Sequence, residues 1–231
     1  MDPKEQVIVA LDVPTMAEAE DLCQRVSGLV DRFKVGLELF AAEGPAVVKM
    51  VQKYGKVMLD LKMHDIPETV LRATKRAVDL GADFMTVHIA GGGNMLDAAV
   101  SGVGSSSTKI LGVTVLTSMN HQDLEDTCVS GTVEGVVLQR AKLAMDRGLY
   151  GVVASVHEAR AVKKLAPELA IVTPGIRPPG GEVGDQKRVA TAGEAKLAGA
   201  SYVVVGRPVR DATNPRAVID CIIAEMRTAV S

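Results

Sequence analysis

The residues with the clearest capacity for chemistry lie in one short stretch, Asp60-Leu61-Lys62-Met63-His64-Asp65. Side chains alternate along a strand, so Asp60 and Lys62 are expected on the same face. Asp65 follows three residues later, just before a proline and a glutamate that favour the first turn of a helix. Charged side chains are rarely buried unless they are paired, and one ammonium between two carboxylates has coupled pKa values. The cluster therefore indicates a functional site.

A structural explanation competes for each residue of this cluster. Asp60 and Lys62 could form an ion pair at the edge of a strand. Asp65 could cap the following helix, because aspartate is common at that position. This explanation is weaker for the three residues together than for any one of them, so we treat them as one candidate site.

The elements that must position this cluster are short apolar runs that alternate with helical patterns. Strands are expected at residues 7–11, 32–36, 57–62, 84–88, 109–117, 151–154, 170–173 and 202–205. Helices are expected at residues 15–26, 45–54, 67–80, 94–100 and 132–147. Eight strand–helix alternations in a chain near the ~250 residues typical of the fold favour an α/β (β/α)8 TIM barrel over an open doubly wound sheet. No linker divides the chain, so residues 1–231 are expected to form a single domain.

Composition limits the classes of partner. A formal charge of −2, 3% aromatic residues and no tryptophan offer neither a basic surface for nucleic acid nor a stacking platform for bases. The first residues lack the apolar core of a signal peptide, and no apolar run approaches the length of a membrane span. The three cysteines are widely spaced and match no metal-binding pattern, so reduced thiols are expected. We expect a cytoplasmic protein that binds neither nucleic acid nor membranes.

In a barrel of this kind the active site is expected at the carboxyl ends of the strands. Polar side chains fall at or just beyond these ends on several strands: Asp12, Lys34, Asp60, Lys62, His88 and Thr117. Alternatives remain for single residues, since Asp12 could form a turn and Lys34 could be solvated. For His88 a structural role, such as a bond to a backbone carbonyl, is favoured. The coincidence of all six residues is what predicts a site at this end of the barrel.

Two later segments predict a phosphate site at the same end. Residues 173–188 form a long, glycine-rich connection after the seventh strand, which makes them a candidate lid. Gly206 and Arg207 directly follow the eighth strand, and Arg177 follows the seventh. Backbone donors and guanidinium groups in these last two loops commonly bind phosphate in this fold. A phosphorylated small molecule is therefore the expected ligand.

Five segments together closely resemble a known family, the bacterial orotidine 5′-phosphate decarboxylases. They are Phe33-Lys34-Val35-Gly36, Asp60-Leu61-Lys62-Met63-His64-Asp65-Ile66-Pro67, Thr173-Pro174-Gly175-Ile176-Arg177-Pro178, Gly184-Asp185-Gln186 and Gly206-Arg207-Pro208. The resemblance runs in order from Val7 to about Pro215. One departure is Thr191-Ala192, where the family is expected to have Thr-Pro at a helix start. The resemblance implies conversion of orotidine 5′-monophosphate to uridine 5′-monophosphate and CO2, the last step of de novo pyrimidine nucleotide synthesis, without metal or organic cofactor.

The resemblance also implies catalytic roles. Lys62 would donate a proton to C6 of the pyrimidine, and Asp60 would lie against the substrate carboxylate. Lys34 and Asp65 would complete an alternating row of charges. Elementary chemistry agrees with these roles, because loss of CO2 leaves a carbanion at C6 that needs positive charge nearby. Flanking carboxylates would keep the Lys62 ammonium protonated.

The remaining implied roles concern substrate binding and assembly. Asp12, Lys34 and Thr69 would bind the ribose hydroxyls, and Thr117 would lie near the base. Four further residues would bind the phosphate: Arg177, Gln186, Gly206 and Arg207. Gln186 would belong to the lid. The resemblance further implies a homodimer in which Asp65, Ile66 and Thr69 of one subunit complete the site of the other.

Two other functions remain open. A magnesium-dependent sugar-phosphate decarboxylase or hexulose-phosphate synthase on a related barrel shares the Asp-x-Lys-x-x-Asp pattern. Those enzymes resemble this sequence less at Lys34, where they have a glutamate that serves the metal, and a lysine there would repel magnesium. A non-catalytic nucleotide-binding barrel is the third possibility, but it would have no need of two acids around Lys62.

Overall fold

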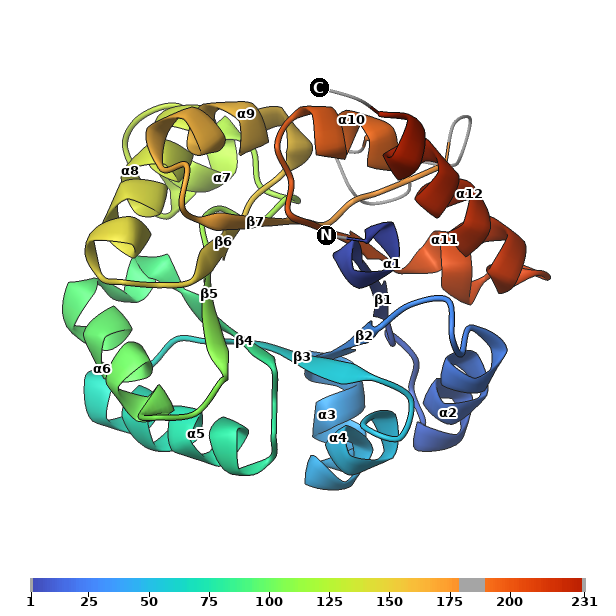
Figure 1. Cartoon of the computed structure of the whole chain (residues 1–231). Helices are drawn as coiled ribbons and strands as arrows, with labels where there is room; N and C mark the ends of the chain where they lie inside the picture. The colour runs from blue at the N-terminus through green and yellow to red at the C-terminus, as the bar shows by residue number, and fades with distance from the viewer. Residues whose placement is uncertain (1, 179–189, 230–231) are drawn as a thin grey trace.

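Eight parallel strands form a closed barrel in the computed structural model, which describes residues 2–178 and 190–229. The strands are β1 (Val7–Ala10), β2 (Arg32–Gly36), β3 (Lys56–Met63), β4 (Phe84–His88), β5 (Lys109–Val113), β6 (Gly151–Val153), β7 (Ala170–Thr173) and β8 (Tyr202–Val205). They are arranged in chain order, and β1 pairs with both β2 and β8 (Figure 1). The predicted (β/α)8 barrel is therefore confirmed.

Most helices lie around the barrel and connect successive strands, whereas the first precedes β1 and the last follows β8 (Figure 1). They are α1 (Pro3–Gln6), α2 (Met16–Arg25), α3 (Leu37–Glu43), α4 (Pro45–Val51), α5 (Pro67–Asp79), α6 (Gly93–Val103), α7 (His121–Asp126), α8 (Val133–Asp146), α9 (Val156–Leu165), α10 (Ala192–Leu197), α11 (Arg207–Arg210) and α12 (Pro215–Thr228), with a 3-10 turn at Ile89–Gly91. Among the described residues, no helix combines the length and the apolar character needed to span a bilayer.

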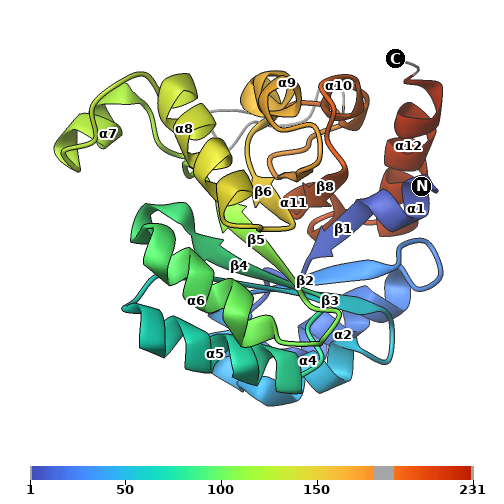
Figure 2. The same ribbon diagram turned by 60° about the vertical axis from the view of Figure 1, so that its left-hand side comes forward.

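The fifth strand is shorter than the sequence indicated. A strand was expected over residues 109–117, but β5 ends at Val113. The chain then leaves the sheet and reaches α7, which lies outside the ring of helices beyond α8 (Figure 2). Apolar residues continue past Val113 because Val115 packs in the core without belonging to the sheet. Thr117 is therefore on a loop above the barrel, not at the end of a strand.

Alternation along the strands divides the apolar side chains into two layers. Ile8 and Ala10 of β1 point into the barrel, and Val7 and Val9 point toward the helices. The same alternation on the other strands fills the interior of the barrel with one cluster: Ile8, Ala10, Met58, Phe84, Leu111, Ala170, Val172, Tyr202 and Val204. Because the interior is packed, ligands are confined to the ends of the barrel.

A polar and aromatic network fills the amino-terminal end of the barrel. Arg32 donates two hydrogen bonds to Asp83 Oδ2, from Nε at 2.9 Å and from Nη2 at 2.6 Å. Its guanidinium carbon lies 4.2 Å from the ring centroid of Phe84 and 5.1 Å from that of Tyr202. These cation–π and ionic contacts satisfy a guanidinium that is only 6% exposed. The amino-terminal end is thus occupied by structural contacts, which leaves the carboxyl-terminal end for function.

Candidate active site

The end of β3 departs from a regular strand at the residues that the sequence singled out. On β4, Met85 pairs with Leu59 and Val87 pairs with Met63. Three β3 residues, from Asp60 to Lys62, therefore lie opposite one β4 residue, Thr86. This is a β-bulge, a device that redirects side chains. Lys62 has a φ of +49°, which is uncommon for a residue other than glycine.

Thr86 connects the two charged residues of this bulge. It is fully buried, and its hydroxyl donates to Asp60 Oδ1 at 2.9 Å. The same hydroxyl oxygen accepts the backbone N–H of Lys62 at 2.9 Å. Lys62 Nζ lies 2.9 Å from Asp60 Oδ2. The two charges are close together, as alternation predicted, but the bulge and the positive φ contribute to their arrangement.

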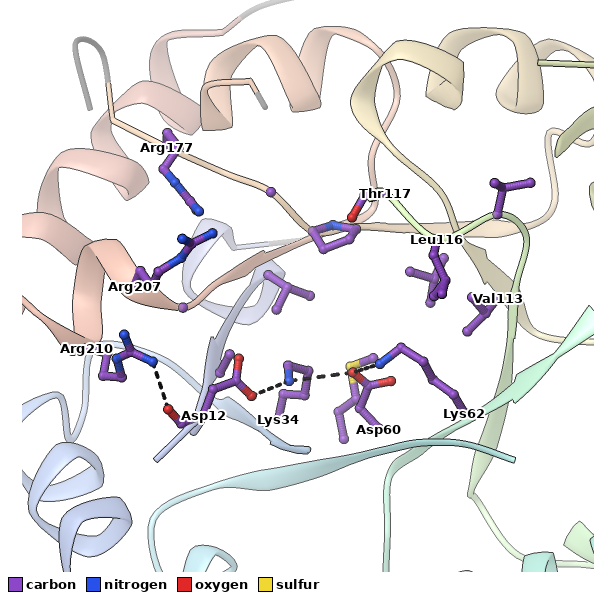
Figure 3. Close-up of a pocket in the computed structure, with 18 residues that line it drawn as sticks. Asp12, Lys34, Asp60, Lys62, Val113, Leu116, Thr117, Arg177, Arg207 and Arg210 are labelled. Atoms are coloured by element: carbon purple, nitrogen blue, oxygen red, sulfur yellow. Dashed lines mark hydrogen bonds and ion pairs between the residues drawn. The ribbon is translucent and has the colours of Figure 1, made fainter. Parts of the chain in front are cut away.

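Four charged side chains form an alternating row across the ends of the first three strands (Figure 3). Asp12, just after β1, accepts a hydrogen bond from Lys34 Nζ at 2.8 Å. Lys34 Nζ also lies 3.6 Å from Asp60 Oδ2, which in turn bonds Lys62. Gly36 leaves space for this row, because a Cβ there would lie 3.0 Å from Asp12 Oδ1 and 3.1 Å from Lys34 Nζ. All four residues were predicted at this end of the barrel, but the expected row included Asp65, and within one chain Asp12 occupies the row instead.

Electrostatics keeps the middle of the row charged. Burial alone would raise the pKa of Asp60, but the ammonium groups of Lys34 and Lys62 and the hydrogen bonds from Lys62 and Thr86 lower it below the ordinary value. Burial would lower the pKa of Lys34, but the carboxylates of Asp60 and Asp12 raise it above the ordinary value. Asp60 is therefore a carboxylate and Lys34 an ammonium at neutral pH.

The row forms one side of a cavity of about 450 Å³ at the carboxyl ends of the strands. Apolar side chains from the β5 and β6 regions form another side: Val113, Val115, Leu116 and Val153. Thr117 lies above them, on the loop after β5 (Figure 3). This combination of an apolar wall and convergent charges suits a flat, partly polar ring.

Cationic side chains from the loop after β7 and from α11, which follows β8, form the other end of the cavity, beside Gly206. The described lining includes Arg177, Arg207 and Arg210, of which Arg177 is buried and donates to the carbonyl of Ile176 at 2.8 Å. Figure 3 shows Arg177 and Arg207 pointing into the same space. These guanidinium groups lie across the cavity from Lys62. The arrangement can bind an anionic group at one end and place a second group against the charge row.

Arg210 was not predicted from the sequence. Its Nη1 donates to the backbone carbonyl of Asp12 at 3.0 Å, and its Nε and Nη2 donate to the Asp211 carboxylate. It therefore links α11 to the loop after β1. The available signal was its spacing, because residues three apart on a helix share a face and Arg207 lies three residues earlier.

Two predicted site residues do not line this cavity, and a third lies outside the described residues. Asp65 is exposed, and its carboxylate accepts the backbone N–H of Ile66 at 2.7 Å, but Ile66 is the N-cap of α5, which has no side-chain capping bond. Thr69 lies on α5 and faces a different surface depression beside Arg72. Gln186 lies outside the described residues, as do most of the candidate lid's residues. Within one chain the structure therefore does not bring Asp65 or Thr69 to the charge row.

His88, at the end of β4, does not line the cavity. Its ring centroid is 5.6 Å from that of His64. Burial lowers the pKa of His88, and the nearby His64 and Lys62 lower it further. Its structural role stays a prediction.

Among the described residues, no group of three or more His, Cys, Asp and Glu side chains is arranged to bind a metal ion.

Comparisons with known proteins show the family of this chain. Residues 5–222 match the family described as "Orotidine 5'-phosphate decarboxylase / HUMPS family". A protein named orotidine 5′-phosphate decarboxylase from Anaeromyxobacter sp. (strain K) is 48% identical, over 97% of this chain and 99% of that protein. One of the same name from Moorella thermoacetica is 47% identical, over 98% and 94%.

A solved structure gives the same result. The crystal structure of orotidine 5′-phosphate decarboxylase from Lactobacillus acidophilus superposes with a TM-score of 0.85 at 36% identity, covering 97% of this chain and 100% of that chain. The barrel, the charge row and the full-length similarity therefore lead to one assignment. This chain belongs to the orotidine 5′-phosphate decarboxylase / HUMPS family.

Proposed function

We propose that this protein decarboxylates orotidine 5′-monophosphate to uridine 5′-monophosphate and CO2. The observation that carries the proposal is the row Asp12, Lys34, Asp60 and Lys62, which lies across a cavity from a set of arginines. The curated relatives of this chain have the name of this activity. A substrate with a carboxylate on a flat ring and a distant phosphate matches the two charged ends of the cavity.

Lys62 supplies the positive charge and the proton. When CO2 leaves, the electron pair of the broken bond stays on C6 of the pyrimidine, where the ring delocalises it poorly. A fixed ammonium directed at that atom stabilises the developing charge and then protonates it. The Lys62 side chain is 29% exposed and faces the cavity, and that of Lys34 is only 11% exposed and bonded to Asp12. Lys62 is therefore the better placed donor.

Asp60 has two roles in this proposal. Its Oδ2 lies 2.9 Å from Lys62 Nζ and 3.6 Å from Lys34 Nζ, and its negative charge raises the pKa of Lys34. The carboxylate also lies where the substrate carboxylate would approach, and the two negative charges repel. Binding energy from the remote phosphate offsets that unfavourable contact.

The other predicted residues bind the substrate. Asp12 and Lys34 interact with the ribose hydroxyls, and Thr117 lies beside the base. Arg177, Gly206 and Arg207 bind the phosphate at the far end of the cavity, where guanidinium groups give charge-assisted bonds. Gln186, which lies outside the described residues, is proposed to bind the same phosphate.

The proposed reaction needs no metal or organic cofactor, because the Lys62 ammonium meets the developing charge. The magnesium-dependent activities of related barrels are not favoured. Lys34 lies 2.8 Å from Asp12 and 3.6 Å from Asp60, so an ammonium already occupies the position where the metal-dependent enzymes are expected to have a glutamate.

We also propose a two-fold homodimer in which Asp65, Ile66 and Thr69 complete the site of the partner. Asp65 would then extend the charge row, and Thr69 would add to the ribose site. Support comes from the exposure of two apolar side chains, Leu37 at 58% and Ile66 at 66%, which follow the paired strands β2 and β3. Exposed large apolar side chains suit a protein interface.

A cytoplasmic location, without nucleic-acid or membrane partners, completes the proposal. The three cysteines are free, which suits a reducing compartment. Cell fractionation followed by a decarboxylase assay checks the location, and recovery of the activity with the membranes would contradict it.

A spectrophotometric assay tests the function. The purified protein is incubated with orotidine 5′-monophosphate, and the ultraviolet change is followed with and without a metal chelator. Turnover to uridine 5′-monophosphate that the chelator does not alter is the expected result. No turnover would refute the proposal, and turnover that the chelator abolishes and magnesium restores would favour the metal-dependent alternative.

A further inference from the structure

Thr86 is a buried residue whose single hydroxyl contacts the charge row without lining the cavity. Phe84, two residues earlier on β4, points into the barrel, and alternation directs Thr86 to the same side. There the hydroxyl lies against the β3 bulge. It donates to Asp60 Oδ1 and accepts from the Lys62 backbone N–H, each at 2.9 Å. One hydroxyl has one hydrogen and two lone pairs, so both bonds form at once.

The bulge explains why a side chain is needed at this point. Three β3 residues face Thr86 alone, so the regular exchange of backbone hydrogen bonds is interrupted there. The N–H of Lys62 is directed to the Thr86 hydroxyl instead. This bond fixes the backbone of a residue that adopts a φ of +49°. The orientation of the Lys62 side chain therefore depends on Thr86.

The second bond fixes the Asp60 carboxylate. Oδ1 is bonded to Thr86, and Oδ2 is left to face the ammonium groups of Lys62 and Lys34 at 2.9 and 3.6 Å. Without the hydroxyl, Asp60 Oδ1 would lose its hydrogen-bond donor, and Asp60 is only 6% exposed to solvent. The carboxylate would then be free to rotate toward either ammonium and to change the position of Lys62.

We propose that Thr86 is a positioning residue for decarboxylation, which acts by fixing the Asp60 carboxylate and the Lys62 backbone through one hydroxyl. It touches neither the cavity nor the proposed phosphate site. Its loss should therefore reduce kcat and leave binding of uridine 5′-monophosphate nearly unchanged. This inference depends on the proposed function.

Three variants test the proposal by steady-state kinetics with orotidine 5′-monophosphate. Thr86→Val keeps the shape and removes the hydroxyl, and kcat should fall about 10- to 100-fold with a change in KM below about threefold. Thr86→Ser retains the hydroxyl and should recover kcat to within about fivefold of wild type. Thr108→Val is the matched control, because Thr108 is also buried but bonds the Ala82 carbonyl at the amino-terminal end of the barrel. Its kcat should match wild type.

A titration of Asp60 tests the positioning without using activity. The carboxyl carbon of Asp60 is followed by NMR in protein labelled with 13C-aspartate, with Asp60→Asn used for assignment. The charged or titratable groups that face it are Lys34 from β2, Lys62 from β3 and His88 from β4. They are the same in every variant. The pKa of Asp60 should be higher in Thr86→Val than in wild type, Thr86→Ser or Thr108→Val, because the carboxylate has lost a donor.

Each outcome decides a separate point. A wild-type kcat in Thr86→Val would overturn the positioning role. An equal loss of kcat in Thr86→Val and Thr86→Ser would also overturn it, because packing of the methyl group would then be responsible. An inactive wild-type protein would refute the proposed function. In that case the Asp60 titration still decides whether Thr86 positions the carboxylate, and an unchanged pKa would overturn the inference.

Discussion

The two lysines of the charge row differ in how well their surroundings suit proton donation to a ligand. Lys34 lies between two carboxylates with its side chain 11% exposed, and Lys62 contacts the Asp60 carboxylate with its side chain 29% exposed toward the cavity. Arg210 of α11, which was not predicted from the sequence, donates a hydrogen bond to the backbone carbonyl of Asp12. The local surroundings of each residue, and not its type alone, therefore decide its role.

Lys62→Ala should abolish decarboxylation while leaving binding of uridine 5′-monophosphate measurable. The substitution removes both the proton and the charge that faces the carbanion, so the loss of kcat should exceed the ~10²–10⁴-fold typical of a general acid alone. Lys56→Ala, at the exposed start of the same strand, is the matched control and should retain wild-type kcat. Retention of a tenth of wild-type turnover by Lys62→Ala would exclude the assigned role.

Arg207→Ala should reduce both substrate affinity and turnover, because phosphate binding energy also stabilises the transition state. The loss should be about 1.5–3 kcal/mol for each charge-assisted bond. Orotidine without its phosphate should be a poor substrate and should discriminate little between the variant and wild type. Arg216→Ala, an exposed arginine on α12, serves as the control. An equally large defect with the unphosphorylated substrate would show that Arg207 acts elsewhere.

Asp60→Asn should change how stability depends on pH. The pKa of Asp60 is lowered in the folded protein, so its contribution is fully present above the unfolded pKa of about 4 and is lost as pH falls through the folded value. Urea unfolding should therefore show wild type more stable than the variant at pH 5–7, with the difference shrinking in more acidic solution. A difference that stays constant down to pH 3 would contradict the lowered pKa.

At the scale of the element, the β3 bulge stores backbone strain. An L-residue in the left-handed region costs about 1–2 kcal/mol, which glycine avoids. Lys62→Gly should therefore be about 1 kcal/mol more stable than Lys62→Ala in urea unfolding, although both lose the ammonium. At Lys56, which has no positive φ, the order should reverse because glycine weakens a regular strand. The same order at both positions would argue against strain at Lys62.

The elements also show what a sequence can and cannot predict. Apolar runs such as Val7–Ala10 identified the strands, because a strand covered on both faces must be continuously apolar. The sequence pattern does not separately predict helices such as α3 and α9, and it extends the fifth strand beyond its observed end at Val113. The bulge could not be read from β3 itself, because its partner Thr86 lies 24 residues away and becomes relevant only through the register of β4.

At the scale of the whole molecule, the site residues fall into two groups. Asp12, Lys34, Asp60 and Lys62 converge in one chain, as the barrel rule predicts. Asp65 lies at the rim with an exposed apolar neighbour, Ile66. We propose that Asp65 acts in the site of a second chain. The rule that site residues lie at the strand ends of one barrel does not predict such a position.

Mixed dimers test this shared site. Asp60→Ala and Asp65→Ala subunits, each nearly inactive alone, are dissociated, mixed and allowed to reassociate. Under two-fold symmetry one site of each mixed dimer collects both substitutions and the other collects neither. Random pairing should therefore restore about a quarter of wild-type sites. No recovery, with mixed dimers verified by mass, would show that each site is built within a single chain.

Closure of the barrel has a consequence for solubility and unfolding. Because β1 pairs with both β2 and β8, every strand has two neighbours and none offers a free edge to another molecule. Edge-to-edge aggregation of the native protein is thereby blocked, and copies can associate only through helices and loops. Removing any one strand would expose two edges at once, which favours cooperative loss of the whole sheet over the peeling of a single strand.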